Sequence, residues 1–437
     1  MKLLIFTPVV KASAIGRVAC LVTNALISLG HQVIVVQTED ALPDLKTVHP
    51  FMAEIVAWRD VHRIETEAVR SDAIIYKAGD NYAFHRGILE WLPRLPGIVS
   101  LHDFFLGSLF WSWGVENRNQ AEAILVAWYG TEIASSFFNY SDSKSFIEGT
   151  CQAAPMTEWI CAMATGVITH SNWGINRVLQ ACPGPVQLVP LAYNAPPHSS
   201  KGYFTANKSS SFNILTVGHM NPNKRVESVI RAIGGSDLLC EHVMYHLVGQ
   251  IQPEYATEIT ELAKRLKVNL EISGEVDDAT FLQAFKKADI VSCLRWPSLE
   301  AASASAIEAM LYGKLIIVTD TGFYSELPDD CVIKVNPDDE IDSIKAALEL
   351  LYNDATLIHS MGKLSKKWAK ETFTADNYAH RLIDIVISTY KAKPIFEAVN
   401  ANVDILKGWG AISSVINLAH TTQPLLIFNG LMVKSKH

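Results

Sequence analysis

The hydrophobic positions of residues 1–193 follow two alternating spacings. Short apolar runs, typical of buried parallel strands, alternate with stretches whose apolar side chains recur every three or four residues, as on one face of a helix. The first unit is a strand at 2–7, a helix over 18–29 that ends at Gly30, and a strand at 32–36. Further strands are predicted at 72–77, 97–102, 166–171 and 186–189, with a helix near 173–181. This strand–helix–strand order predicts a parallel sheet.

A second series of the same kind begins at Phe212. Its predicted strands and helices are strands 213–217, 244–248, 270–273, 290–294, 315–319 and 332–335, and helices 254–266, 280–288 and 375–391. Between the two series, residues 194–211 are rich in Pro, Gly, Ser, Asn and Lys and lack periodicity, which predicts a linker. We therefore predict an α/β protein with doubly wound, Rossmann-like domains at 1–193 and 212–374. They face across a cleft, and a helix and extension follow at 375–437.

Composition narrows the functional class. The chain has 437 residues, a net charge of −8 and no long basic run, which argues against nucleic acid as the main partner. Its seven cysteines form no CxxC pair and no zinc pattern, so a reducing cytoplasm is expected. The apolar start is too short for a signal peptide, and no apolar run reaches the roughly 20 residues that span a bilayer.

Residues 295–320 carry the most chemical information. Glu300 lies in a loop of small residues after an apolar run, and Glu308 lies in a helix that Ser303 can cap and Gly313 can end. This loop faces the carboxyl edge of the sheet, where α/β proteins bind ligands and helix amides suit phosphate. The carboxylates can accept hydrogen bonds from ribose or sugar hydroxyls. The alternative is that both glutamates are ordinary solvated charges.

A second candidate segment runs from Gly218 to Arg225, after the first strand of the second series. Lys224 and Arg225 would lie at the start of a helix, where cations are disfavoured unless an anion joins them. This pattern suggests a diphosphate clamp, and two solvated surface cations are the alternative.

In the first series, His102 ends a strand and so faces the same kind of edge. It can donate to a substrate oxygen or move a proton, or it is a strand-end histidine that the backbone satisfies. Gly16 lies at the first strand–helix turn and permits close backbone approach. The chain lacks both a G-x-G-x-x-G fingerprint at this turn and a P-loop, which argues against a nicotinamide enzyme and a P-loop NTPase.

Taken together, these segments resemble the GT-B glycosyltransferases, in particular the retaining family 4 group, over most of the chain up to about residue 392. The resemblance rests on Glu300 and Glu308 with seven residues between them, followed by Ala309-Met310 and Gly313. It implies that Glu308 holds the donor ribose, that Glu300 lies beside the donor sugar, and that Lys224 binds the donor diphosphate. Further residues that it assigns to the site are His102 near the transferred sugar, Gly16 and Gly218, Glu275 and Val276 at the nucleobase, and Ala301, Ala302 and Ser303 at the donor loop.

The chain departs from the family pattern at two positions. His219 stands where the family has Arg, and we expect Arg225 to compensate for it. Ala301 stands where the family often has Gly. Residues 327–330, Leu-Pro-Asp-Asp after Gly322, are similar to bacterial members that build surface polysaccharides.

We therefore expect a retaining transferase that moves a sugar from a nucleoside-diphosphate sugar to a glycan or lipid-linked acceptor. Lys224, Arg225 and helix amides near Ser303 would stabilise the leaving diphosphate. No metal and no cofactor are expected. Two alternatives stay open, a sugar-nucleotide epimerase of the same fold and a degenerate GT-B subunit that only binds a partner.

An aromatic stretch bears on the acceptor. Phe104, Phe105, Leu109, Phe110, Trp111 and Trp113 crowd together with no charge among them, and Phe137, Phe138 and Tyr140 repeat the pattern. The simpler interpretation is core packing. The alternative is an apolar ledge that touches a membrane and receives a lipid-linked sugar, which would make the enzyme peripheral at the inner face of the membrane.

Overall fold

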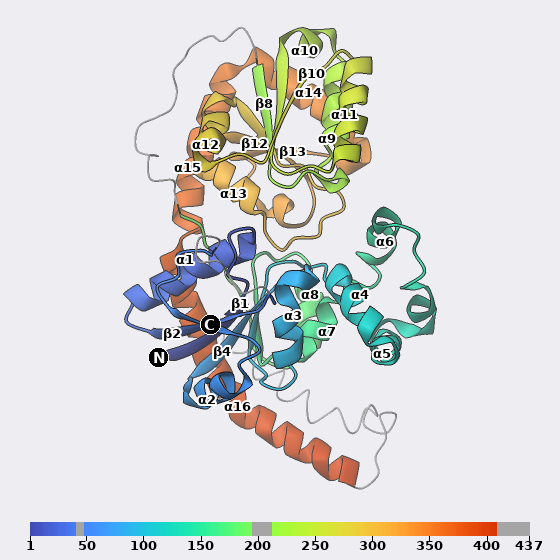
Figure 1. The fold of residues 1–437 in the computed structure, drawn as a ribbon. Coiled ribbons are helices and arrows are strands. Elements are labelled where there is room, and N and C mark those ends of the chain that lie inside the picture. The colour runs from blue at the N-terminus through green and yellow to red at the C-terminus, as the bar shows by residue number, and fades with distance from the viewer. Residues whose placement is uncertain (41–47, 195–211, 409–437) are drawn as a thin grey trace.

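Two parallel sheets organise the chain in the computed structural model, which describes residues 1–40, 48–194 and 212–408 (Figure 1). The first sheet has the order β3-β2-β1-β4-β5-β6-β7 and the second the order β10-β9-β8-β11-β12-β13. Every pairing between these strands is parallel. The predicted fold class, an α/β protein with two doubly wound domains, is confirmed.

The strands of the first sheet are β1 Lys2–Thr7, β2 Gln32–Gln37, β3 Glu54–Ala57, β4 Ala73–Ala78, β5 Ile98–Leu101, β6 Gly166–Thr169 and β7 Val186–Leu188. Six of them lie where the apolar runs predict. Edge strand β3 is missed, because only Val56 of its four residues is buried and both ends are exposed. Successive side chains of a strand enter different cores: Leu3 and Ile5 pack on one face, Leu4 and Phe6 on the other.

The strands of the second sheet are β8 Phe212–Val217, β9 Val243–Val248, β10 Asn269–Gly274, β11 Ile290–Ser292, β12 Leu315–Thr319 and β13 Val332–Val335. All six match predicted strands. The helices that follow them are α9 Val226–Gly234, α10 Asp237–His242, α11 Pro253–Arg265, α12 Asp278–Lys287, α13 Ala304–Leu311, α14 Glu340–Asn353 and α15 Ala355–Thr372. The predicted linker lies outside the described residues except for Asn194.

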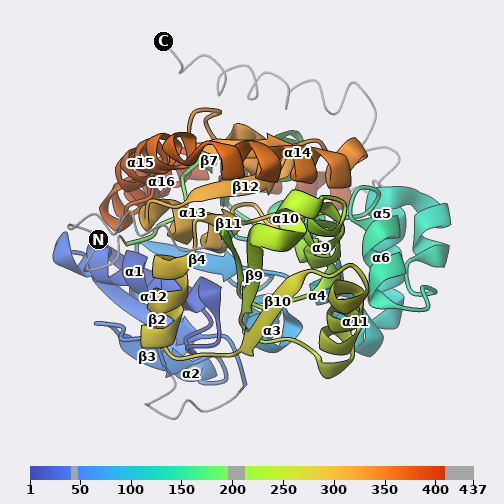
Figure 2. The same cartoon turned by 90° about the horizontal axis from the view of Figure 1, so that it is seen from above.

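Helices α1 Ala14–Ser28, α2 Val61–Arg70, α3 Tyr82–Trp91, α7 Thr157–Ala162 and α8 Ile175–Ala181 cover the first sheet. Between β5 and β6 the chain also forms α4 Gly107–Glu116, α5 Arg118–Ser136 and α6 Ser143–Thr150, which project to one side (Figures 1 and 2). Sequence periodicity did not predict this lobe, since glycines and aromatic residues interrupt its apolar stripes.

The aromatic stretch lies mainly in the core of this lobe. Phe104, Phe105, Leu109 and Phe110 are buried, as is Phe137. Trp111 and Trp113 are half-buried, and their rings pack against Phe138, Phe146 and Trp159 at centroid distances of 4.8–5.1 Å. These contacts favour the core interpretation over an exposed ledge.

The last helix, α16 Ala375–Gly408, is longer than the predicted 375–391. It returns from the second sheet to the first, where it packs on α1 and β6 (Figures 1 and 2). One hydrophobic cluster contains Val22 of α1, Ile307 of α13 and Leu382 of α16, so these helices form a shared core between the sheets. Among the described residues, no helix is long and apolar enough to span a membrane.

Candidate active site

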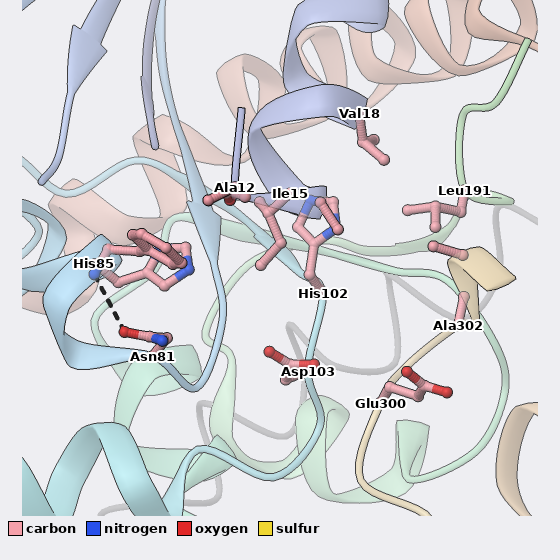
Figure 3. A pocket seen from close by; sticks show the side chains of 14 residues that line it. Ala12, Ile15, Val18, Asn81, His85, His102, Asp103, Leu191, Glu300 and Ala302 are labelled. Atoms are coloured by element: carbon pink, nitrogen blue, oxygen red, sulfur yellow. Dashed lines mark hydrogen bonds between the residues drawn. The ribbon is translucent and has the colours of Figure 1, made fainter. Parts of the chain in front are cut away.

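A cavity of about 240 Å³ opens between the carboxyl edges of the two sheets (Figure 3). The first sheet contributes residues 12–15 of the β1–α1 connection, the start of α3 at Asn81, and His102 with Asp103 after β5. The second contributes Glu300, Ala302 and Ala304 from the loop between β11 and α13. The structure therefore brings predicted residues from both halves, His102 and Glu300, to one cavity.

The loop before α13 fixes Glu300. Arg295 Nε lies 3.2 Å from Glu300 Oε1, and the Tyr324 hydroxyl donates to the same oxygen. Arg295 is buried and also donates to Leu294 O at 2.7 Å and Ser305 Oγ at 3.3 Å. At the end of this loop Ser303 is the N-cap of α13, and its hydroxyl accepts from Ala306 N, as predicted. Gly313 follows the helix with a φ of 76°, also as predicted.

The backbone next to Glu300 joins the two halves of the protein. Ala301 N donates to His102 O at 3.0 Å, and Phe104 N and Phe105 N donate to Leu299 O at 2.9 and 3.0 Å. Asp103 and Glu300 thus form an isolated antiparallel bridge, and both residues line the cavity (Figure 3). This bridge sets the spacing of His102 and Glu300 across the cavity.

Glu308, the predicted ribose ligand, also contacts the first half. Arg17 Nη2 lies 3.3 Å from its Oε1, and the Tyr193 hydroxyl donates to its Oε2 at 3.2 Å. The Arg17 guanidinium stacks over the Tyr193 ring at 4.7 Å. Glu308 is largely buried, so these partners satisfy a carboxylate that burial would otherwise penalise.

Lys224 is buried beside Gly218. It ends the short helix η1 Pro222–Lys224, and its Nζ donates to Val217 O at 2.6 Å. Burial and, to a smaller extent, the charge of Arg295 lower the pKa of Lys224 to about 7, and Glu300 partly opposes this shift. A Cβ on Gly218 would lie 3.2 Å from Lys224 Nζ, and φ is 92° there, so a side chain is disfavoured at this position.

The expected role of Arg225 does not fit its placement. Its Nε and Nη2 donate to the carboxylate of Glu340 at 2.7–3.0 Å, and Ser228 donates to the same group. The buried Glu340 therefore holds Arg225, and the cation that accompanies Lys224 is Arg295. His219, which replaces the family Arg, is exposed.

His102 lies on a buried polar network. Lys77 Nζ contacts the Tyr378 hydroxyl at 2.6 Å, Tyr378 contacts Ser100 Oγ at 2.8 Å, and Ser100 Oγ lies 3.3 Å from Nε2 of both His102 and His170. Burial holds the pKa of His102 well below its ordinary value, and the His170 and Lys77 charges act in the same direction. His102 is therefore neutral at physiological pH.

The network limits the proton positions. His170 Nδ1 lies 2.8 Å from Val189 O and must donate to it, so His170 Nε2 accepts from Ser100. Ser100 Oγ has two lone pairs for three neighbours, the Tyr378 hydroxyl, Lys77 Nζ at 3.4 Å and His102 Nε2. In the tautomer in which His102 Nε2 donates to Ser100, His102 Nδ1 accepts from a substrate hydroxyl.

Asp103, which follows His102 at the end of the predicted strand, also lines the cavity. Burial and, to a smaller extent, the Glu300 charge raise its pKa to about 7, against a hydrogen bond from Asp80 N at 2.8 Å. Perturbed carboxyl groups of this kind are common in enzyme sites.

The remaining predicted residues are placed as follows. Gly16 lies in the first turn of α1, where a Cβ would be 2.7 Å from Pro8 O, so its close approach is to the protein backbone. Glu275 is exposed and Val276 half-buried in the connection after β10. Ala301 and Ala302 are buried at the donor loop. Among the described residues, no cluster of His, Cys, Asp and Glu could hold a metal ion.

Residues 204–368 match the family model described as "Glycosyl transferases group 1". This part of the chain is a glycosyltransferase domain, and the protein is a glycosyltransferase. Curated protein sequences give no significant match to the chain.

Solved structures show the fold of the glycosyltransferase. The chain is similar to sucrose-phosphate synthase from Thermosynechococcus elongatus (14% identity, TM-score 0.61, 90% of this chain and 100% of that one). It is also similar to HepE from Anabaena (16%, 0.60, 89% and 100%) and to WaaG, a glycosyltransferase involved in lipopolysaccharide biosynthesis (14%, 0.56, 88% and 99%). At these identities the likeness shows the GT-B fold.

The sequence placed Asp103 beside His102 at the sheet edge but gave it no role, and it did not indicate Arg295, Tyr324, Arg17 or Tyr193. Arg295 carried a local signal, since it closely follows the buried strand β11. Arg17 and Tyr193 reach Glu308 across roughly three hundred and one hundred residues, and only the fold brings them together.

Proposed function

We propose that this glycosyltransferase moves a sugar from a nucleoside-diphosphate sugar to a glycan or lipid-linked acceptor, with retention of anomeric configuration. The observation that carries the proposal is a cluster of two buried basic side chains, Lys224 and Arg295, beside one half-buried carboxylate, Glu300. Buried like charges are costly unless a counter-ion joins them. A diphosphate supplies the missing negative charge, and we propose that it does so without a metal ion.

Each site residue has a role in this proposal. Lys224 and Arg295 stabilise the leaving diphosphate, and the free amides at the start of α13 add to this stabilisation. Glu308 exchanges its contacts with Arg17 and Tyr193 for ribose hydroxyls. Glu300, held by Arg295 and Tyr324, accepts hydrogen bonds from the donor sugar, and His102 binds a sugar hydroxyl from the other side.

The proposed step is a front-face displacement, which the family resemblance suggests. The bond between the sugar C1 and the diphosphate oxygen breaks, and its electron pair stays on the diphosphate. The acceptor oxygen bonds to C1 on the same face, and its proton passes to a leaving phosphate oxygen. The step needs no protein nucleophile, in keeping with the capture of Glu300 by Arg295 and Tyr324.

UDP-glucose is the first donor to test, because HepE has been solved with UDP and with UDP-glucose. The test is a thermal-shift panel of nucleoside-diphosphate sugars, followed by donor hydrolysis and transfer assays. A donor at 100 times its dissociation constant stabilises the protein by about 2.7 kcal/mol. Lys224→Ala should lower turnover at least about a hundredfold with an intact fold. No stabilisation by any donor would contradict the proposal.

A further inference from the structure

A second cavity, of about 300 Å³, lies between α8 and the loop that precedes Glu300. Phe104, Trp173 and Arg177 line it from the first half of the protein, and Trp296 and Ser298 line it from the second. Its volume is at the small end of the range for ligand pockets.

Aromatic rings form much of this cavity's wall. Trp173 packs on Phe104 with ring centroids 4.5 Å apart, which fixes one wall. Trp296 belongs to the facing domain and is 40% exposed, a large fraction for a tryptophan at a cavity. Rigid, partly exposed rings of this kind offer flat apolar surfaces that bind a ligand with little loss of side-chain entropy.

The polar groups of the cavity suit a neutral ligand. The Ser298 hydroxyl is covered and lies against Gly322, so it is not offered to a ligand. Asn172 donates its backbone and side-chain N–H groups to Glu326, which leaves its side-chain carbonyl as an acceptor. Among the described residues, Arg177 is the one charged side chain of the lining, and Glu158 at 2.7 Å neutralises it. Amide groups, from Gln152, Asn172 and Asn176, beside aromatic faces match a sugar better than a phosphate or a carboxylate.

The cavity adjoins the transfer site. Phe104 directly follows Asp103, and Ser298 lies two residues before Glu300, on the two segments that bridge the halves. We propose that this second cavity binds a neutral inner sugar of a glycan acceptor. This inference rests on the proposed function, because it names the acceptor class of the same enzyme.

The test uses the full chain and an array of short neutral oligosaccharides of hexose and N-acetylhexosamine units, with anionic oligosaccharides printed beside them. We expect binding to at least one neutral oligosaccharide, then quantified by calorimetry. Trp296→Ala should weaken that affinity at least about tenfold, since a stacking surface is lost. Trp128→Ala is the matched control, because Trp128 is also 40% exposed but lies on α5, away from the cavity.

A second variant tests the inference in case Trp296→Ala does not fold. Asn176 is exposed on α8 and lines the cavity, so Asn176→Ala should keep the fold and weaken binding of the same oligosaccharide at least threefold. Binding to no neutral oligosaccharide, a preference for anionic ones, or equal affinity of the wild type and the Trp296→Ala variant would overturn the inference. Calorimetry with UDP on the same proteins separates the two proposals, because UDP affinity tests the donor site and should not depend on Trp296.

Discussion

Arg295 Nε lies 3.2 Å from Glu300 Oε1, and both side chains are held in place by further partners, Ser305 for the first and Tyr324 for the second. The pair belongs to a single loop, yet it faces Lys224 from another loop and Asp103 from the other half of the protein. Arg295 therefore serves two neighbours: it positions Glu300, and it adds a second positive charge beside Lys224.

Replacing Arg295 by Met should lower turnover at least about a hundredfold, on the order of 2.7 kcal/mol, because it removes a charge at the leaving group and frees Glu300. Arg295→Lys should recover part of the loss. Steady-state kinetics with circular dichroism to verify folding checks both. Arg225→Met is the informative contrast: it leaves the buried Glu340 unpaired, so we expect mainly a lower melting temperature. If Arg225→Met cost more turnover than Arg295→Met, the two arginines would have to exchange roles.

Binding of a nucleoside diphosphate should take up a proton. The pKa of Lys224 is about 7 in the unliganded protein, and a bound diphosphate raises it by stabilising the ammonium. Above pH 7, the free lysine is largely neutral and the bound one charged, so affinity should fall as pH rises from 7 to 9. Calorimetry of UDP in buffers with different ionisation enthalpies measures this uptake at pH 8. Lys224→Met should abolish it, and an uptake that persists in this variant would mean that another group is responsible.

Lys77 should make stability depend on pH. Burial lowers its pKa to about 7, from an ordinary value of about 10.5 in the unfolded chain. Between these values the unfolded state binds more protons, so stability rises with pH by up to about 1.4 kcal/mol per unit from this group. The difference in unfolding free energy between the wild type and Lys77→Met should therefore grow in favour of the wild type from pH 7 to pH 10. Denaturant titrations across this range test the prediction, and a pH-independent difference would show that Lys77 is not the group that titrates.

Trp111 and Trp113 should behave as core residues. Their rings contact Phe138, Phe146 and Trp159, so the double change to Ser should lower stability by at least about 2 kcal/mol. Thermal unfolding measures this, and Trp128→Ser is a control on the exposed side of α5. A double variant that unfolds like the wild type but no longer co-sediments with anionic liposomes would instead support the membrane ledge.

The sequence predicted most of the fold because many strands, such as β1, β5, β6 and β12, are apolar runs that a parallel sheet buries. Helix-terminus signals also predicted the Ser303 cap and the Gly313 stop. The family resemblance, rather than the strand pattern, implied that His102 and Glu300 lie at one site, and both line the same cavity. The prediction that Arg225 joins Lys224 in binding the diphosphate was wrong. Arg225 pairs with Glu340, which lies more than a hundred residues away in the sequence, so the local pattern could not reveal this contact. The lobe between β5 and β6 was not predicted, because its helices lack a regular spacing of apolar residues. The contacts of Glu308 were not predicted either, because they join residues that only the folded chain brings together.

The most direct test of the central claim is nuclear magnetic resonance of donor turnover. The wild-type protein is incubated with UDP-glucose, or with the donor that the thermal-shift panel selects, and the first anomer of the released or transferred sugar is recorded before mutarotation. The account predicts release of the nucleoside diphosphate and a sugar with the anomeric configuration of the donor, with Lys224→Ala losing the signal. An inverted first product would contradict the retaining mechanism, and binding of the donor without turnover by the wild type would contradict the proposed transferase.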